Sequence, residues 1–497
     1  MRGVSAELKS APMRVAACAG VLGSYGLAKA VMPVDVRTRW ATTPLLERLR
    51  VVRAARQIMA SRAEDFAAAI SPLLARTKAD TLVTELLPLL DACRFLEREA
   101  KLILAPRKLG RRGRPLWLRS VEAEIHREPL GHVLVIGPSN FPLFLPGVQA
   151  LQALVAGNTV TWKPGAGGGE VALLVAEVLH EAGLPEGVLT VTDDSVEAAQ
   201  RALTAKPDKV IFTGSARTGQ SVLVDLAETA TPAVLELSGA DAIVVTPSAN
   251  LPLVAKAVAF GLRLNGGAVC MSPRRLFATP TTMSALRPLL DSELASVPAV
   301  LLNPATSARL RSMLDEAVAD GAIIRGVLEP GEQRPLLVDR AEAGMSITRS
   351  DVFAPVLSLI EVESMLHVPE VYAQCPFALT VAIFCNEGNE TEARTLSKML
   401  KAGTVLINDV IAPTADPRVP FGGRGASGYG VTRGAEGLLE MTAVKTLLIR
   451  RGGAMRHLEA TSDGDTQLFA ALIGAMHGKG IATRWAALKQ VIKSARN

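Results

Sequence analysis

The feature that most constrains this chain is a regular alternation of short apolar segments and helical patterns between residues 132 and 229. Apolar segments bounded by Gly, Pro or Asp predict strands, and three- and four-residue hydrophobic spacing predicts helices. The expected strands are 132–136, 159–162, 188–191 and 209–212, and the expected helices are 143–156, 170–182, 196–203 and 218–229. Such alternation predicts a parallel, twisted sheet that binds ligands at the carboxyl ends of its strands.

A chain of 497 residues is too long for one ordinary core, so two or three domains are expected. Hydrophobic residues make up 49% and charged residues 21%, which is typical of globular proteins. The net charge of +6 comes from scattered basic residues, with no basic stripe interleaved with aromatics. We therefore expect no nucleic-acid partner.

The remaining segments predict helices, further strands and two exposed extensions. Helices are expected at 44–104 and 250–264, and strands at 233–237, 242–245, 275–278, 401–407 and 442–449. The segment 107–127 suits a hairpin, which could pair with a partner subunit, and 420–430 contains too many glycines for a helix. The tail from residue 466 has a basic amphipathic pattern that fits either a docked helix or a flexible extension.

Cys270 stands out in the segment N-G-G-A-V-C-M-S-P-R-R, which follows an apolar run. Two preceding glycines allow close approach of backbone and substrate, so the thiol is a candidate nucleophile. Read alone, the segment favours a buried structural thiol, because free Cys is among the most buried residue types. Glu236 in V-L-E-L-S-G and Asn140 in G-P-S-N-F-P change that balance. A thiol, a carboxylate and an amide donor are the parts needed for acyl chemistry at a carbonyl.

The five cysteines are widely spaced, without a C-x-x-C pair, and the six histidines are dispersed. Neither a disulfide framework nor a metal site is expected, and a reducing, cytoplasmic location fits best. No segment reaches the roughly 20 apolar residues of a membrane span. The run 15–28 after a basic lead fits a targeting signal less well than a first amphipathic helix.

Over about residues 107–449 the chain resembles the aldehyde dehydrogenase superfamily. The resemblance rests on five motifs in matching order: G-P-S-N-F-P, K-P, T-G-S, V-L-E-L-S-G and the Cys270 segment. It implies an α/β fold with a Rossmann-like dinucleotide-binding domain (1–107 and 130–238) and an α/β catalytic domain (239–430). It also implies a small oligomerisation ribbon (108–129 and 440–452) and therefore a homodimer or homotetramer, with a basic helical tail at 453–497.

By this resemblance Cys270 attacks the aldehyde carbon, and the Asn140 amide with the Cys270 backbone N–H stabilises the oxyanion. A free thiol with a pKa of about 8.5 is only a few per cent thiolate at neutral pH, so Cys270 must lose a proton. Glu236 is the general base for the water that hydrolyses the thioester. Read singly, Asn140 fits a turn residue and Glu236 a salt-bridged strand residue.

The resemblance also implies an NAD or NADP site. Lys163 would reach an adenosine ribose hydroxyl, Ser215 and the helix N-terminus would meet the pyrophosphate, and Asp351 with Phe353 would lie on the nicotinamide side. The remaining positions of the expected cofactor site are Ile136, Pro138, Ser139, Gly214 and Leu237.

Several positions depart from the family pattern. Ala166 stands where an acid often holds the adenosine 2′-hydroxyl, so NADP is allowed and NAD is not excluded. Asp351 is one methylene shorter than the usual glutamate, and Ala354 replaces a glycine. Other altered positions are Ser139, Ala268 and the segment L-S-G-A-D after Glu236. These departures describe a divergent member.

The expected substrate is a small-molecule aldehyde, and the pocket positions after Asn140 are Phe141, Phe144, Leu145 and Val148. These side chains favour an apolar aldehyde and offer no charge for an acidic one. Two alternatives remain: a relative that transfers the acyl group to coenzyme A, against which Glu236 speaks, and a catalytically silent homologue that acts as a binding or assembly subunit.

Overall fold

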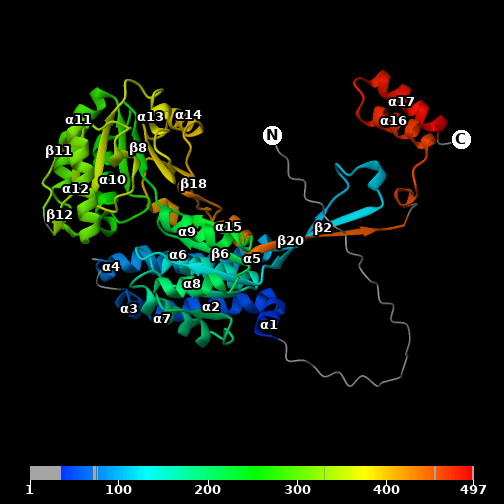
Figure 1. Ribbon diagram of the computed structural model, residues 1–497, viewed down its shortest axis with the longest axis horizontal. Coiled ribbons are helices and arrows are strands. Elements are labelled where there is room, and N and C mark those ends of the chain that lie inside the picture. Colours follow the sequence, from blue (N-terminus) through cyan, green and yellow to red (C-terminus); the bar gives the residue numbers. More distant parts are fainter. Residues whose placement is uncertain (1–34, 71–73, 75, 330, 453–454, 495–497) are drawn as a thin grey trace, which may run out of the picture.

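The computed structural model describes residues 35–494 except 71–73, 75, 330 and 453–454. It contains two large sheets covered by helices, and a long ribbon that extends away from both (Figure 1). The run at 15–28, for which a first amphipathic helix was expected rather than a targeting signal, lies outside the described residues.

The first sheet has six strands in the order β19-β7-β6-β3-β4-β5, and only the edge strand β19 is antiparallel. Its strands are β3 (His132–Ile136), β4 (Thr159–Lys163), β5 (Leu189–Val191), β6 (Lys209–Thr213), β7 (Ala233–Glu236) and β19 (Gly428–Tyr429). The alternation in the sequence thus predicted the parallel α/β architecture correctly, with boundaries within a few residues.

Both faces of the first sheet are covered by helices. Because alternate residues of a strand point to opposite sides, each strand contributes side chains to both cores. Val133 and Val135 of β3 face one core, whereas Leu134 and Ile136 face the other. The larger core is covered by α1 (Val36–Thr42), α2 (Leu45–Ser61), α3 (Ala63–Ala68), the π-helix η2 (Leu82–Leu86), α5 (Leu87–Ile103), α6 (Phe144–Ala156) and α7 (Gly169–Glu181). The short α4 (Lys78–Thr81) leads into η2. The smaller core is covered by α8 (Val196–Thr204) and α9 (Ala216–Ala227).

The second sheet has seven strands in the order β11-β13-β14-β9-β8-β16-β17, and its edge strand β11 is antiparallel. The strands are β8 (Asp241–Val245), β9 (Pro273–Ala278), β11 (Ile323–Arg325), β13 (Leu336–Asp339), β14 (Val356–Glu361), β16 (Thr380–Phe384) and β17 (Thr404–Ile407). One face packs against α10 (Leu251–Arg263) and α11 (Pro280–Leu294), and the other against α12 (Pro304–Ala319), α13 (Val368–Tyr372) and α14 (Thr391–Met399).

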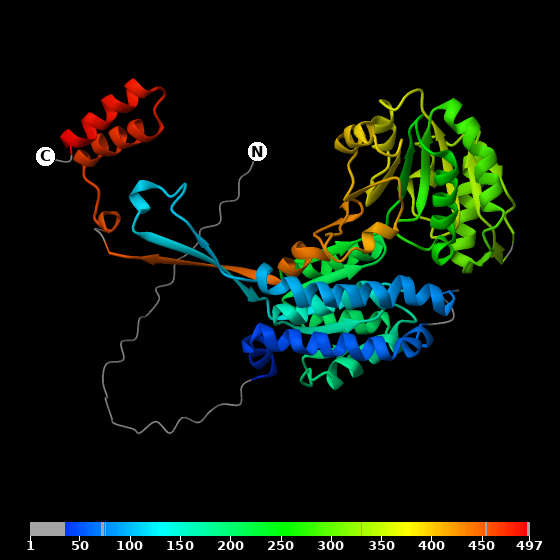
Figure 2. The same ribbon diagram turned by 180° about the vertical axis from the view of Figure 1, so that it is seen from behind.

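The ribbon is a three-stranded antiparallel sheet of β1 (Arg107–Leu109), β2 (Val121–Pro129) and β20 (Thr442–Arg450). Figure 2, which views the molecule from behind, also shows the ribbon projecting from the body. The β1–β2 connection contains a 3-10 helix, η3 (Leu116–Leu118), where the sequence pattern suggested hairpin backbone. β20 is joined to the body by α15 (Gly434–Glu440).

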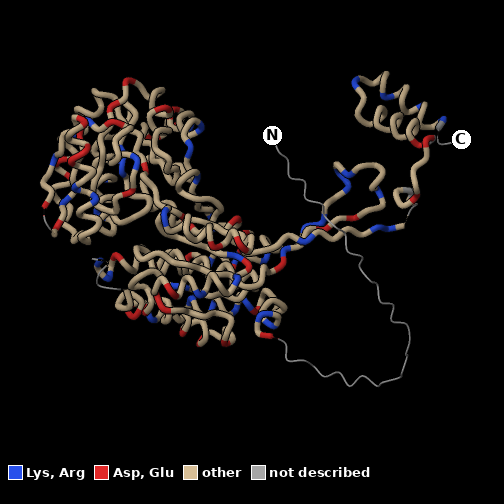
Figure 3. Tube along the Cα trace, in the orientation of Figure 1, with Lys and Arg blue, Asp and Glu red and all other residues tan. Residues whose placement is uncertain are grey.

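The tail forms two helices, α16 (Asp463–His477) and α17 (Ile481–Ser494), which pack against each other beyond the ribbon. Along the described chain, acidic and basic residues are interspersed (Figure 3). Among the described residues, no helix is both long and apolar enough to cross a membrane.

Candidate active site

A pocket of about 490 Å³ opens where loops from the two sheets meet. From the first sheet it is lined by residues that follow β3, β6 and β7; from the second it is lined by the Cys270 loop and by 351–353. Parallel strands present their carboxyl ends at one edge, and ligands bind at that edge. The predicted site residues at this pocket are Pro138, Ser139, Asn140, Leu145, Gly214, Ser215, Glu236, Leu237, Cys270, Asp351 and Phe353.

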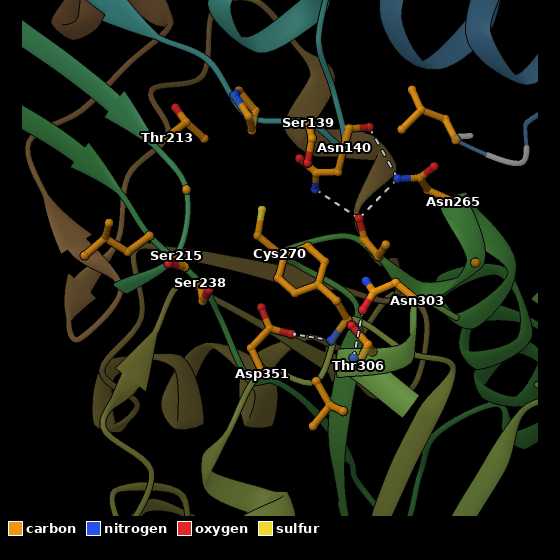
Figure 4. A pocket seen from close by; sticks show the side chains of 18 of the residues that line it. Ser139, Asn140, Thr213, Ser215, Ser238, Asn265, Cys270, Asn303, Thr306 and Asp351 are labelled. Carbon is orange, nitrogen blue, oxygen red and sulfur yellow. Dashed lines mark hydrogen bonds between the residues drawn. The ribbon is translucent and has the colours of Figure 1, made fainter. Parts of the chain in front are cut away.

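The Cys270 loop leaves α10 through an unusual turn. Asn265 has φ +49°, and Gly266 and Gly267 have φ +61° and +74°, a region that glycine enters without strain. A Cβ on Gly239 would lie 2.4 Å from the Cys270 carbonyl oxygen, so only glycine fits in the loop after β7. Figure 4 shows the Cys270 sulfur pointing into the pocket.

Asn140 is tied to the Cys270 loop. Its side-chain Nδ2 donates to the Ala268 carbonyl oxygen at 3.0 Å, and Asn265 Nδ2 donates to the same oxygen and to the Asn140 carbonyl (Figure 4). The second N–H of the Asn140 amide has no acceptor among the described residues. One amide hydrogen fixes the side chain, and the other is available to a ligand in the pocket.

The loop that carries Asn140 is held from beneath by Glu85. Its Oε2 accepts hydrogen bonds from the backbone N–H groups of Leu143 and Phe144, at 3.0 and 2.7 Å, where α6 begins. Its Oε1 lies 2.6 Å from Arg76 Nη2 in a buried ion pair. Because α6 has no side-chain cap of its own, this carboxylate replaces the missing cap.

Glu236 ends β7 and is 4% exposed. The Thr432 hydroxyl donates to its Oε1, and the Thr213 hydroxyl lies 3.4 Å from its Oε2. Burial raises the pKa of Glu236, whereas the charge of Arg433 and the two hydroxyl groups lower it. A carboxyl group with a raised pKa exchanges protons more readily near neutral pH, as a general base requires.

The Cys270 thiol is surrounded by acids. Burial and the charges of Asp241, Glu236 and Asp351 raise its pKa, and Arg433 lowers it. The protein alone therefore favours the neutral thiol, and positive charge nearby is needed to form the thiolate.

The residues predicted to bind a dinucleotide fall into two groups. Gly214 and Ser215 line the pocket at the start of α9, where the Ser215 hydroxyl accepts the Thr218 N–H at 3.2 Å. Ile136 and Lys163 are largely buried and are not among the residues that line it. Lys163 Nζ has no hydrogen-bond or ion-pair partner in the described part of the chain, although Asp193 and Asp194 act on its charge.

Asp351 also has unused binding capacity. Its Oδ1 lies 3.4 Å from Arg274 Nη2 and accepts the Phe353 N–H, whereas its buried Oδ2 has no hydrogen-bond partner among the described residues. Burial raises the pKa of Asp351 to about 6. An orphaned carboxylate oxygen beside the pocket is suited to accept a ligand hydroxyl, so the residues present fit a dinucleotide.

Of the predicted substrate residues, only Leu145 is among those that line the pocket. Phe141, Phe144 and Val148 are 9%, 7% and 2% exposed, because the start of α6 packs into the first core and against two arginines. Other apolar side chains line the pocket instead: Leu74, Val300, Leu301, Leu302, Val352, Leu379 and Phe421.

The sequence reasoning missed Thr432, Arg433 and Arg274, which contact or act on the acids of this site. Arg274 lies within the Cys270 segment itself and could have been noticed there. Thr432 and Arg433 follow a glycine-rich loop, and nothing in their local pattern indicates a partner almost two hundred residues away. No group of three or more His, Cys, Asp or Glu side chains in the described ranges could hold a metal ion.

The two sheets, the ribbon and a pocket containing a thiol, a buried carboxylate and an amide define an enzyme of the aldehyde-oxidising class. The model of the aldehyde dehydrogenase family matches residues 27–447. The chain belongs to the aldehyde dehydrogenase family, whose members depend on NAD or NADP.

Individual relatives are distant. The chain is 27% identical over 414 residues to the 4,4′-diapolycopene aldehyde oxidase of Methylomonas sp, covering 81% of this chain and 77% of the relative. The fold is similar to that of the Mycobacterium tuberculosis aldehyde dehydrogenase complexed with NAD+, with a TM-score of 0.77, 24% identity and coverage of 84% and 88%. It is also similar to the NADP-dependent glyceraldehyde-3-phosphate dehydrogenase of Bacillus halodurans C-125 complexed with NADP, with a TM-score of 0.75, 26% identity and coverage of 83% and 88%.

Proposed function

We propose that this protein oxidises an apolar aldehyde to a carboxylate, with Cys270 as nucleophile, Asn140 as oxyanion donor and Glu236 as general base. The observation that carries the proposal is that these three side chains, far apart in the sequence, line one pocket. We assign dinucleotide binding to 1–107 and 130–238 and catalysis to 239–430. This division agrees with a pocket built from the loops of both sheets.

In the first step the Cys270 thiol would release its proton to solvent water, and its sulfur would bond to the aldehyde carbon while the carbonyl electron pair moves to the oxygen. The developing oxyanion would be stabilised by the free N–H of the Asn140 amide and the Cys270 backbone N–H. Asn140 is suited to this role because its other N–H is already fixed on Ala268, so little ordering remains.

The chemistry that a dinucleotide would supply here is a hydride acceptor, and loss of the hydride from the carbon bonded to the Cys270 sulfur would leave a thioester. Glu236 would then take a proton from the water that attacks the thioester carbon, releasing the carboxylate and the Cys270 sulfur. The two threonine hydroxyls hold its carboxylate in place for this proton transfer.

Ser215 and the N-terminus of α9 are suited to bind the pyrophosphate of a dinucleotide. The free Oδ2 of Asp351 is suited to accept a hydrogen bond from a ribose hydroxyl of the same cofactor. We further propose a preference for NAD over NADP. Asp194 accepts the Gly167 N–H at 2.9 Å beside Lys163, so a carboxylate stands near the position where Ala166 lacks one. A 2′-phosphate at Lys163 would be repelled by this charge.

The apolar lining supports an apolar aldehyde, with residues such as Leu145, Leu301 and Leu379 in place of the deeper α6 side chains.

We also propose that the ribbon pairs two copies of the chain in a homodimer or homotetramer. Its strand β20 exposes Val444, Leu447 and Leu448, which are 59%, 44% and 64% exposed.

A panel of aldehydes with graded chain length, run with NAD and NADP and with or without coenzyme A, tests the activity. We expect reduction of the nicotinamide with a free carboxylate as product, and a higher kcat/KM for longer apolar aldehydes. An acyl-coenzyme A product would assign the acylating reaction instead. No turnover on any member, combined with unaltered cofactor binding, would support the silent homologue.

A further inference from the structure

The ribbon carries two exposed elements at the end that lies away from the body. At this end Val121 of β2 pairs with Arg450 of β20, so the β1–β2 connection (110–120) leaves the ribbon beside the start of the tail (Figure 1). The nine residues of β2, at about 3.4 Å each, place this end about 30 Å from the body. The connection 110–120 and the hairpin of α16 and α17 together form what we call the distal end.

The β1–β2 connection exposes apolar and basic side chains together. Leu116 and Trp117 of η3 are 74% and 65% exposed. Residues 110–120 include four arginines and no acidic residue, and none of these arginines forms an ion pair with a described residue (Figure 3). The four are Arg111, Arg112, Arg114 and Arg119. Two large apolar side chains are thus held in water among positive charges that the protein does not neutralise.

The hairpin of α16 and α17 leaves its large apolar residues outside. Its two helices meet through small residues, because a Cβ on Gly474 would lie 3.1 Å from the Ala487 Cβ, and Ala471 is buried. The larger apolar residues of α17 stay exposed, and their spacing of four, three and four places them on one helix face. They are Ile481, Trp485, Leu488 and Ile492, and Trp485 is 60% exposed.

Positive charges flank this apolar face of α17. With 3.6 residues per turn, Arg484 lies on one side of the face and Lys489 on the other. Residues 466–494 contain no acidic residue, and their cations are Lys479, Arg484, Lys489 and Lys493. An apolar helix face that carries a tryptophan and is flanked by cations is typical of helices that lie in a membrane interface.

The combination of charge and apolar surface decides between possible partners. Exposed apolar groups that cluster mark an interaction site, and clustered cations are attracted to anionic lipid headgroups. A nucleic acid would neutralise the arginines but leave the aliphatic side chains in water. A second copy that met this one through the same surface would bring like charges together. A bilayer with anionic lipids satisfies both the charges and the apolar side chains.

We propose that the distal end binds the surface of a membrane that contains anionic lipids. Trp117 and Trp485 lie at the level of the headgroups, and the exposed aliphatic side chains enter the boundary with the acyl chains. This inference goes beyond the proposed oxidation, because binding requires neither aldehyde nor cofactor. It also leaves the middle of β20 free to pair with another copy of the chain.

The first test is co-sedimentation of the full chain with vesicles of phosphatidylcholine and phosphatidylserine in a three-to-one ratio, at physiological ionic strength. We expect binding to these vesicles, weaker binding at higher salt, and none to phosphatidylcholine alone. Arg111→Gln/Arg112→Gln should weaken the binding about 30-fold, because each cation near an anionic surface contributes about fivefold. The control Arg394→Gln/Lys398→Gln removes two exposed cations of α14 and should bind as the wild type does.

The apolar contribution is tested separately by Leu116→Gln, which should weaken vesicle binding about tenfold or more. Its control is Leu366→Gln, because Leu366 is 73% exposed and lies outside the distal end. Equal losses in the controls, unchanged binding in both distal variants, or a wild-type protein that does not bind the mixed vesicles would overturn the proposal.

Other occupants of the distal end give different results. A lower assembly mass of Leu116→Gln in size-exclusion chromatography with light scattering, without vesicle binding by the wild type, would assign the surface to a second copy. Retention of duplex DNA or RNA without vesicle binding would assign it to nucleic acid, and either result overturns the proposal. Vesicle binding by a protein that oxidises no member of the aldehyde panel would instead refute the proposed function alone.

Discussion

Replacing Glu85 should destabilise the part of the protein that positions Asn140. Glu85 and Arg76 have side chains that are 0% and 3% exposed, and Glu85 also accepts the two amide hydrogens at the start of α6. Glu85→Ala leaves a buried guanidinium without its counter-ion, which costs about 3–5 kcal/mol. Two unpaired amide donors each add about 1–3 kcal/mol before relaxation, so we expect a total loss of about 5 kcal/mol or more.

Glu85→Gln separates the two contributions. The amide oxygen can still accept from Leu143 and Phe144, but the charge opposite Arg76 is gone, so we expect only the counter-ion contribution, a loss of about 3–5 kcal/mol. At about 2–4 °C per kcal/mol this lowers the unfolding midpoint by about 6–20 °C. The double variant Arg76→Met/Glu85→Gln removes the buried charge and should recover most of that loss.

Differential scanning calorimetry at one scan rate provides the measurement. The matched control is Asp65→Asn, which removes an exposed partner of Arg62 and should cost less than about 1 kcal/mol. A Glu85→Gln midpoint within 1 °C of wild type, or a double variant less stable than the single one, would refute the electrostatic argument.

Three further predictions concern the chemistry. Asn140→Ala should lower kcat by about 10²–10³-fold with cofactor affinity unchanged, because an oxyanion donor is lost; a wild-type kcat in steady-state assays would exclude this role. Asp194→Asn should narrow the difference between NAD and NADP affinities measured by calorimetry, and equal narrowing in the exposed control Asp225→Asn would count against it. Burial raises the pKa of Glu236, and hydrolysis needs its ionised carboxylate. The rate constant of single-turnover deacylation should therefore fall as the pH is lowered through the pKa of Glu236, which lies above the usual ~4.3 of a glutamate. In Glu236→Gln this acidic decrease of the rate constant should be absent.

The sequence predicted the elements whose signals are local. Strand β3 was placed at its observed residues because four apolar residues end at Gly137-Pro138, and α6 was recognised from its continuous apolar pattern before Gly157. The grouping of Cys270, Glu236 and Asn140 was proposed from their chemistry and order. Their common pocket depends on how two sheets meet, and local patterns carry no information about that packing.

The parts that were not foreseen depend on long-range contacts. Helical spacing cannot show that Phe144 turns towards Arg433 instead of the pocket, because both sides of that helix turn are apolar. The ion pair of Asp351 with Arg274 likewise joins a loop to strand β9, which is separate from it in the sequence. The family motif identified Asp351 as a site residue, but it could not show which carboxylate oxygen of Asp351 lacks a hydrogen-bond partner.

The most direct test of the central claim is intact-mass analysis of Glu236→Gln, quenched after mixing with a reactive aldehyde and the preferred cofactor. The claim predicts one acyl group per chain, located on Cys270 by peptide mapping, that accumulates in this variant and decays quickly in the wild-type protein. The adduct should be absent from Cys270→Ala/Glu236→Gln. An acyl group on another residue, or its absence while nicotinamide is reduced, would contradict a reaction that passes through Cys270 and is completed by Glu236.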